Sequence, residues 1–166
     1  MLFRPYADAD FEALYTLEEL CFQPPLRFTR RYMRSLVARP DAAVWVAARE
    51  SGLAGFAVAV NSRRRRGVRF AYIETIEVAP DARGLGLGRE LLQRLEDSVR
   101  ASGASFIWLH TDALNGAAIR LYESAGYQCQ GREENFYPQG RAALVYRKGL
   151  AEDSPAAPAV ARQARI

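Results

Sequence analysis

Apolar positions along this chain follow two different periods, which alternate from one segment to the next. Phe11, Leu14, Leu17 and Leu20 recur every three residues, a spacing typical of a helix that buries one face. Segments such as 53–62 are instead rich in Val and Ala and are bounded by turn residues, which is typical of strands. The pattern therefore predicts a protein of the mixed α/β class.

The two periods and the turn residues between them predict the order β-α-α-β-β-β-α-β-α-β-β. Asp8 or Asp10 is placed to cap the first helix, and Asn115 is placed to cap the last one. The expected elements are strand 2–7, helices 11–20 and 28–38, strands 42–50, 53–62 and 69–79, helix 87–103, strand 105–111, helix 115–126, and strands 127–137 and 142–149.

One helical crossover in this order joins two strands, 69–79 and 105–112. Such a connection places its two strands in parallel, here within an otherwise antiparallel sheet. Residues 1–149 are expected to form one domain. The composition changes to Ala, Pro and small polar residues after that, so 150–166 is expected to be a flexible tail.

Composition narrows the functional classes only slightly. The chain has 166 residues, of which 49% are hydrophobic, and its net charge of +4 is compatible with phosphorylated ligands or acidic partners. No apolar run approaches the ~20 residues that span a bilayer. Cys21 and Cys129 give neither a disulfide framework nor metal-ligand spacing. We therefore expect a cytoplasmic protein without a metal or a membrane partner.

The run "ARGLGLGRELL" at 82–92 places three glycines at alternate positions before a helix. A dinucleotide-binding turn would need glycine where Arg89 stands, and a phosphate-loop NTPase would need lysine after Gly88. What remains is a general anion site, because N–H groups at the start of a helix, with Arg83 and Arg89 nearby, suit a pyrophosphate. The structural alternative is a tight turn whose glycines only relieve steric crowding.

These residues resemble the GNAT superfamily of N-acetyltransferases. Arg83, Gly84, Leu85, Gly86, Leu87 and Gly88 match its Arg/Gln-x-x-Gly-x-Gly/Ala motif, and "NGAAIRLYESAGY" resembles its downstream motif. The opening "FRPYADADFEALYTLEELCF" and the later "EENFYP" are similar to the RimI-like subgroup, which acetylates ribosomal-protein alanines and other protein N-termini. Together the matches cover most of residues 2 to 148.

The resemblance implies the GNAT fold, with a splayed parallel pair at the centre of the sheet, and acetyl-CoA as co-substrate. It further implies that the backbone of strand 69–79 pairs with the pantetheine arm. Asn115 is alternatively a plain helix cap, and Tyr122 a core aromatic. The expected donor-site residues are Ile76, Glu77, Val78, Arg83, Gly84, Leu85, Gly86, Leu87, Gly88, Arg89, Asn115 and Tyr122.

His110 is the only histidine in the chain. By strand alternation it shares a face with Phe106 and Trp108, which alone would favour a structural role. Bacterial relatives carry glutamate at this position as the base, whereas some eukaryotic N-terminal acetyltransferases carry histidine and use it with a strand tyrosine, here Tyr72. The resemblance therefore implies Tyr72 and His110 as the base pair.

Tyr137 matches the general acid of the bacterial enzymes and is alternatively a turn tyrosine beside Pro138. Tyr122 competes for the acid role, and Glu74 is a third candidate base. An α-amine costs about 1.4 kcal/mol to deprotonate at pH 7 and a lysine about 4.6 kcal/mol, so a neutral imidazole suits the α-amine.

We therefore expect transfer of an acetyl group to a primary amine, foremost a protein N-terminus. The alternatives are a small amine, a lysine or a CoA-binding module without catalysis.

Four arginines at 63–66 lack the accompanying aromatics and basic clusters of a nucleic-acid site, so they predict a solvated loop or a contact with an acidic partner. Monomer and homodimer both stay open.

Overall fold

The computed structural model describes residues 1–63 and 67–150, and its elements follow the predicted order. The remainder of the arginine run, 64–66, and residues 151–166 of the expected tail lie outside the described residues. The strands are β1 (Leu2–Pro5), β2 (Ala42–Arg49), β3 (Gly52–Arg63), β4 (Arg69–Val78), β5 (Phe106–Asp112), β6 (Gln128–Glu133) and β7 (Ala143–Gly149). The helices are α1 (Phe11–Cys21), α2 (Arg30–Val37), α3 (Leu87–Ala101) and α4 (Gly116–Ser124).

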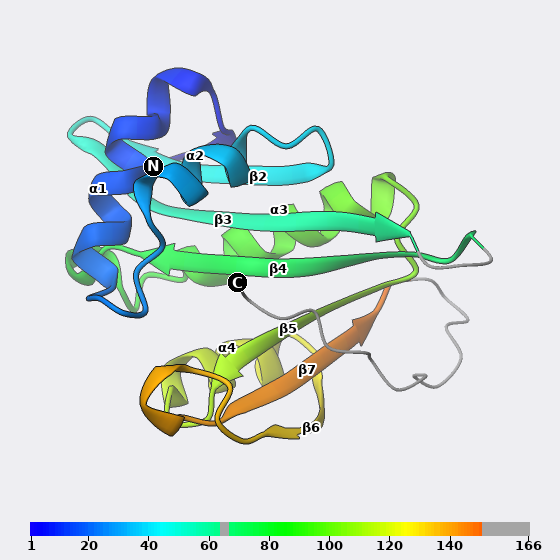
Figure 1. Ribbon diagram of the computed structural model, residues 1–166. Helices are drawn as coiled ribbons and strands as arrows, with labels where there is room; N and C mark the ends of the chain where they lie inside the picture. Colours follow the sequence, from blue (N-terminus) through cyan, green and yellow to red (C-terminus); the bar gives the residue numbers. More distant parts are fainter. Residues whose placement is uncertain (64–66, 151–166) are drawn as a thin grey trace.

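The strands form one mixed sheet in the order β1-β2-β3-β4-β5-β7-β6 (Figure 1). β4 and β5 are parallel, and every other neighbouring pair is antiparallel. The predicted parallel pair inside an antiparallel sheet is thus confirmed. The last strand, β7, lies between β5 and β6, so residues of β6 are held two strands away from β5.

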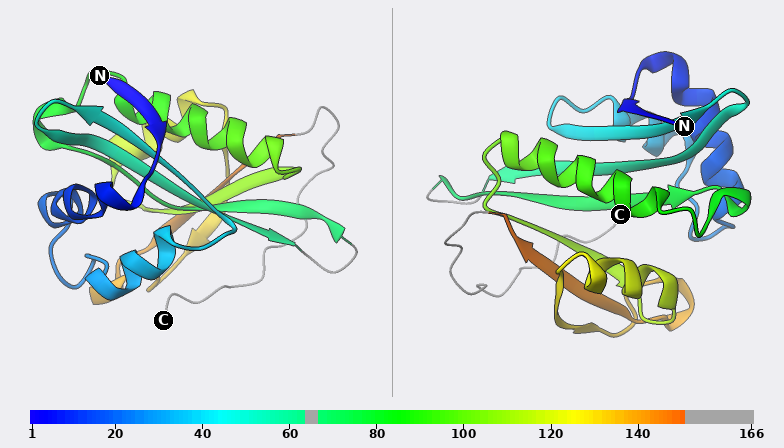
Figure 2. Two further views of the ribbon diagram at one scale, coloured as in Figure 1. Left: turned by 90° about the horizontal axis from the view of Figure 1, so that it is seen from above. Right: turned by 180° about the vertical axis from the view of Figure 1, so that it is seen from behind.

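Helices cover both faces of the sheet. Figure 2 shows α1 and α2 on one face and α3 and α4 on the other. α3 packs most closely on β2, β3 and β4, and Leu91, Leu95 and Val99 are fully buried along one side of it. No helix in the described ranges is both long enough and apolar enough to cross a bilayer.

Helix α1 buries a different stripe from the predicted one. Phe11, Leu14 and Leu17 are buried as expected, but Leu20 is 61% exposed. Glu18 is buried in its place. At 3.6 residues per turn, the position seven residues after Phe11 returns to the same face, whereas a strict spacing of three drifts away from it.

The start of α1 also differs from the prediction. Asp10 precedes the helix but its side chain caps no helical N–H. Its carboxylate instead accepts hydrogen bonds from the Arg4 guanidinium at 2.7 Å and from the Ala7 N–H at 2.8 Å, which fastens β1 to α1. Asn115 does cap α4 as predicted, because its side-chain oxygen accepts from the Ala118 N–H at 3.1 Å.

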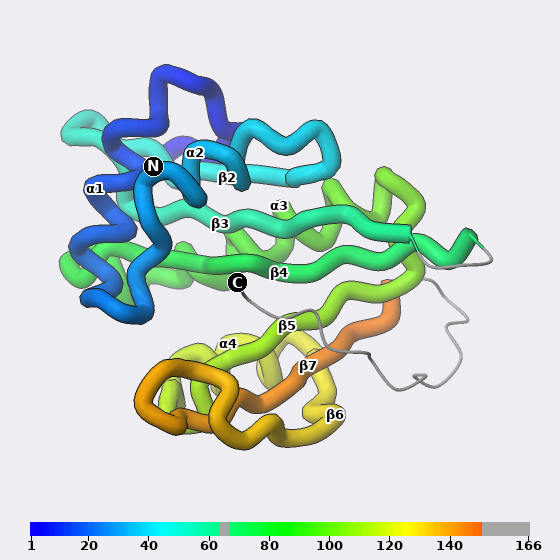
Figure 3. The backbone as a smooth tube through the Cα atoms, viewed as in Figure 1, coloured from blue at the N-terminus to red at the C-terminus, as the bar shows by residue number. Residues whose placement is uncertain are grey.

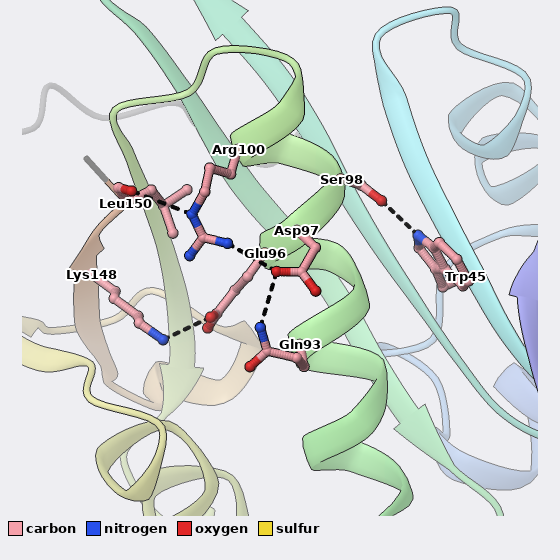
Figure 4. Close-up of polar contacts among 8 residues, drawn as sticks. All are labelled: Trp45, Gln93, Glu96, Asp97, Ser98, Arg100, Lys148 and Leu150. Atoms are coloured by element: carbon pink, nitrogen blue, oxygen red, sulfur yellow. Dashed lines mark hydrogen bonds and ion pairs between the residues drawn. The ribbon is translucent and has the colours of Figure 1, made fainter. Parts of the chain in front are cut away.

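Helix α3 holds the two halves of the sheet together (Figure 4). On one side the Trp45 indole N–H of β2 donates to Ser98 Oγ at 2.8 Å. On the other side Lys148 Nζ of β7 donates to the buried Glu96 carboxylate at 2.7 Å. Leu150, the first residue of the expected tail, is itself buried, and its N–H donates to the Ser105 carbonyl at 2.8 Å.

β4 and β5 pair over only part of their length. Phe70, Ala71 and Tyr72 align with residues 106–108, and beyond this paired end the two strands separate, as Figure 3 shows. The β3–β4 register shifts at Glu74, where β4 carries one extra residue. Such a bulge bends a strand and re-aims the residues after it. We call the separated part, residues 73–78 and 109–112, the open end.

Candidate active site

A cavity of about 420 Å³ lies at the open end of β4 and β5. Its walls come from both strands, the connection between α1 and α2, the start of α4 and the connection between β6 and β7. The lining residues are Glu18, Phe22, Leu26, Phe28, Ile73, Glu74, Thr75, Ile76, His110, Thr111, Asp112, Leu114, Asn115, Ala118, Tyr122, Tyr137 and Arg141. Six residues singled out from the sequence therefore meet at one cavity.

The glycine turn leads from the end of β4 into α3. Gly84 and Gly86 have φ of +76° and +80°, a left-handed conformation that favours glycine. The Glu90 N–H donates to the Gly86 carbonyl at 3.1 Å, so the N–H groups of 87–89 precede the first intrahelical bond. Leu85 is 72% exposed at the tip of the turn. The turn thus combines an accessible backbone with the positive end of the α3 dipole.

Both arginines of the turn contact carbonyl oxygens. Arg83 Nε donates to the Val78 carbonyl at 3.2 Å, which braces the turn against the end of β4. Arg89 Nη1 donates to the Ser124 carbonyl at 3.3 Å and to Ser124 Oγ at 3.1 Å, at the C-terminus of α4. The guanidinium of Arg89 therefore also ties α3 to α4, a contact that the sequence did not predict.

The backbone of β4 is paired on one side only at the open end. Ile76, Glu77 and Val78 align with β3. On the side of β5, the pairing among the described residues stops at Tyr72. A strand edge without a partner strand is able to pair with an extended ligand, because main-chain N–H and C=O groups point outward from it, although the Val78 carbonyl already accepts from Arg83 Nε at 3.2 Å.

His110 and Tyr72 meet across the two parallel strands. The Tyr72 hydroxyl and His110 Nδ1 are 3.1 Å apart, within hydrogen-bond distance. Trp108 packs edge-on against both rings, with centroid distances of 4.7 Å to Tyr72 and 5.3 Å to His110. The side chain of His110 is only 3% exposed, and it lines the cavity. The sequence-predicted pair is thus brought into contact, with His110 in the cavity wall.

Two further residues contact His110 and were missed from the sequence. Glu133 of β6 places Oε1 3.4 Å from His110 Nε2. Phe136 stacks on the imidazole with a centroid distance of 4.1 Å. Both lie in the segment "EENFYP", whose similarity marked the segment but gave neither residue a role. Because β7 separates β6 from β5 in the sheet, the contacts with His110 depend on a strand order that the chain order does not give.

Tyr137 and Tyr122 line the cavity from different elements, the connection between β6 and β7 and helix α4. The Tyr137 N–H donates to the Arg141 carbonyl at 2.9 Å, which closes the turn that carries its ring. Tyr122 is buried on α4, and this burial, with a smaller contribution from Tyr137, raises its pKa well above the ordinary value. The phenol of Tyr122 is therefore protonated at neutral pH.

A buried pair of carboxyl groups lies under the cavity. Glu18 of α1 accepts a hydrogen bond from the Phe28 N–H at 2.7 Å, and Glu77 of β4 accepts one from Thr75 Oγ1 at 3.0 Å. Burial, and then the neighbouring Glu18, raise the pKa of Glu77 well above its usual range. Burial likewise raises the pKa of the Cys21 thiol to about 11. The sequence did carry a signal for Glu18, namely its position on the apolar stripe of α1.

Two curated relatives match part of this chain. The ribosomal protein bS18-alanine N-acetyltransferase of Escherichia coli (strain K12) is 43% identical over 68 residues, which cover 41% of this chain and 46% of the relative. The N-alpha-acetyltransferase RimI of Mycobacterium tuberculosis is 40% identical over 95 residues, 56% of this chain and 57% of the relative. The chain thus matches about half the length of these relatives.

A crystal structure of the ribosomal-protein-S18-alanine N-acetyltransferase from Escherichia coli has the same fold. It superposes with a TM-score of 0.78 at 24% identity and covers 92% of this chain and 96% of its own. The family model described as "Acetyltransferase (GNAT) family" matches residues 11–127, which include α1, the glycine turn, His110 and α4. The chain therefore belongs to the GNAT family of acetyltransferases.

Proposed function

We propose that this protein transfers an acetyl group from acetyl-CoA to the α-amine at the N-terminus of a protein, such as a ribosomal protein. The observation that carries the proposal is the cavity between the separated strands, with His110, Tyr137, Asn115 and Tyr122 in its walls. Membership in the GNAT family supports the reaction class. The names of these two relatives, among several that match, support the α-amine as acceptor.

The residues around the glycine turn fit acetyl-CoA. Backbone N–H groups at 84–89 and the positive end of α3 suit a pyrophosphate. The free edge of β4 at 76–78 suits the amide-containing pantetheine arm, which is able to pair like an added strand. Asn115 and Tyr122 line the cavity beside this edge. When bound, acetyl-CoA supplies an activated thioester.

Tyr72 and His110 are the proposed base. The imidazole lines the cavity and contacts the Tyr72 hydroxyl, so a proton taken up at the hydroxyl has a path to Nδ1. Glu74 also lines the cavity and is the remaining candidate. An α-amine needs only about 1.4 kcal/mol to lose its proton at pH 7, which lies within the reach of an imidazole base.

Tyr137 is the proposed acid that protonates the departing thiolate, with Tyr122 as the competitor. Tyr137 sits on the connection between β6 and β7 and lines the cavity. Tyr122 keeps its proton at neutral pH because burial raises its pKa. Single Tyr→Phe variants of each position separate the two roles, because only loss of the acid slows the chemical step at saturating acetyl-CoA.

The proposal is tested by measuring CoA-SH release from acetyl-CoA with matched acceptors. One peptide carries a free α-amine, a second carries the same sequence blocked at the N-terminus with one lysine, and a polyamine represents small amines. We expect release with the free α-amine and little with the other two. Release with the polyamine alone would assign a small-amine acetyltransferase, and acetyl-CoA binding without release would assign a CoA-binding module. Ribosomal-protein N-termini belong in the panel, because two relatives are named for acetylating protein N-termini.

A further inference from the structure

Glu133 faces the side of His110 that lies opposite Tyr72. Its Oε1 is 3.4 Å from Nε2, whereas the Tyr72 hydroxyl is 3.1 Å from Nδ1. The imidazole is therefore placed between a phenol on β4 and a carboxyl group on β6. The side chain of Glu133 is 26% exposed, and that of His110 is 3% exposed, so the contact lies at the edge of the buried region.

The sheet register explains how β6 reaches His110. His110 aligns with Val145 of β7, and Val145 aligns with Gly131 of β6. Aligned residues in neighbouring antiparallel strands share a face, and so do residues two apart along one strand. Glu133 therefore lies on the same face as His110, and its side chain extends across β7 toward Nε2.

A neutral imidazole carries its proton on one nitrogen only. A proton on Nε2 lies beside the carboxylate of Glu133, whose Oε1 is 3.4 Å from Nε2, an ion-pair distance outside hydrogen-bond geometry, and is stabilised by its charge. A proton on Nδ1 would instead leave the Nε2 lone pair facing that negative charge, which is unfavourable. The titratable groups in contact with His110 are Tyr72 from β4 and Glu133 from β6. The same cavity is also lined by Glu18, Glu74, Asp112, Tyr137 and Arg141.

We propose that Glu133 is a positioning residue that holds His110 in the Nε2-protonated form, so that Nδ1 accepts the proton of the Tyr72 hydroxyl. The role of this arrangement in catalysis rests on the proposed function, whereas the protonation state of His110 does not. It assigns the Tyr72 oxygen, whose only proton points at His110, as the atom that accepts a proton on the substrate side.

The proton balance of the step follows from this arrangement. One N–H proton of the acceptor ammonium moves to the Tyr72 oxygen, directly or through a water molecule, while the hydroxyl proton moves to His110 Nδ1. The amine is then neutral and His110 is an imidazolium ion. The carboxylate of Glu133 stabilises that cation, and no oxidant or further reactant is required.

Nuclear magnetic resonance tests the protonation state directly. His110 is the only histidine in the chain, so labelling histidine with ¹⁵N gives a single imidazole in the spectrum of the intact protein. Above the pH at which the ring becomes neutral, we expect the ¹⁵N shifts to report a protonated Nε2 and an acceptor Nδ1. A protonated Nδ1 in the wild type would overturn the proposal. This readout needs no turnover, so it stands even if the proposed acetylation is not found.

A matched pair of variants tests the role of the carboxylate. Glu133→Gln keeps the size of the side chain and removes its charge, so we expect the imidazole to titrate at lower pH and kcat/KM to fall about tenfold or more. Glu134→Gln changes the next residue, whose side chain is 64% exposed and pairs with Arg132, and is expected to leave both values unchanged.

Phe136 provides the structural alternative, because its ring alone could hold the imidazole in place. In that case Glu133→Gln would change neither the titration of His110 nor the ratio of its two neutral tautomers, with the proton on Nδ1 or on Nε2. This outcome would overturn the proposal. A shifted titration in a variant with intact thermal stability would support it.

Discussion

The two ends of the β4–β5 pair differ in backbone pairing: the strands are hydrogen-bonded to each other at one end and separated at the other. At the paired end, Phe70 and Phe106 stack with a centroid distance of 5.3 Å, and the strands hydrogen-bond to each other. At the open end, the strands part around a cavity lined by carboxylates, hydroxyls and the imidazole of His110. One end stabilises the sheet, and the other leaves a strand edge for a ligand.

The difference teaches that contacts with neighbouring elements, and not only the residues of the two strands, decide where a strand pair separates. The bulge at Glu74, in the pairing with β3, bends β4. Helix α3 contacts both halves of the sheet, through Trp45 of β2 and Lys148 of β7. An unpaired edge is costly unless another group pairs with it. The fold tolerates the open end because the separation is confined to half of each strand.

Loss of the Tyr72 hydroxyl should give the largest effect. Tyr72 is the last residue of β4 that pairs with β5, and Tyr72→Phe keeps its ring against Trp108 while removing the contact with His110. We expect kcat to fall about 10²- to 10⁴-fold with acetyl-CoA affinity retained. Steady-state kinetics with an accepted amine measure this. Tyr146→Phe, which loses only a hydrogen bond to Glu123, is the control and should leave kcat nearly unchanged.

The two ends of α3 offer a second comparison. Gly86, at the N-terminal end of α3, has φ of +80°, and Gly103, just after its C-terminal end, has φ of +84°, so valine is strained at both. We expect each Val variant to lose about 1–2 kcal/mol of stability. Only Gly86→Val should raise the KM for acetyl-CoA, by about tenfold, because its side chain would obstruct the anion site. Equal KM values in the two variants would remove the glycine turn from the donor site.

The paired end should affect stability and not catalysis. Phe106 stacks on Phe70 and lies under the Arg147 guanidinium, whose carbon is 4.2 Å from the ring centroid. Phe106→Leu is expected to lower the free energy of unfolding by about 1–2 kcal/mol while leaving KM and kcat within about twofold of the wild type. Denaturant unfolding and kinetics on the same preparation check both values. A large loss of kcat would mean that the two ends are mechanically coupled.

The smallest effect is expected at the buried carboxyl pair. Folding raises the pKa of Glu77, so its ionisation opposes folding, and the stability of the wild type should decline as the pH rises through that raised value. Glu77→Gln removes this penalty and should raise the melting temperature by about 2–4 °C at pH 8. The gain should vanish near pH 4, where the carboxyl is protonated in both states. A gain that does not depend on pH would assign the effect to packing.

The order of elements and most of their bounds were predictable, because apolar period and turn residues act locally. Leu91, Leu95 and Val99 are buried as a helical stripe requires. The prediction failed for Leu20 because a repeat of three residues was extended to the end of α1. The buried stripe instead continues through Glu18, and Leu20 is exposed. Strand β6 was predicted to reach Tyr137 but ends at Glu133, since the connection that follows turns back toward Arg141.

The amino-acid sequence by itself determined the α/β class, the glycine turn and the residue types available for chemistry, since these depend on neighbours along the chain. The splayed central pair was expected from the family resemblance and is confirmed. The tertiary structure alone decided that the separation begins after Tyr72, that Glu18 and Glu77 are buried together, and that Glu133 faces His110. The physical reason is the strand order: β7 enters between β5 and β6, so groups far apart in the chain share one face of the sheet.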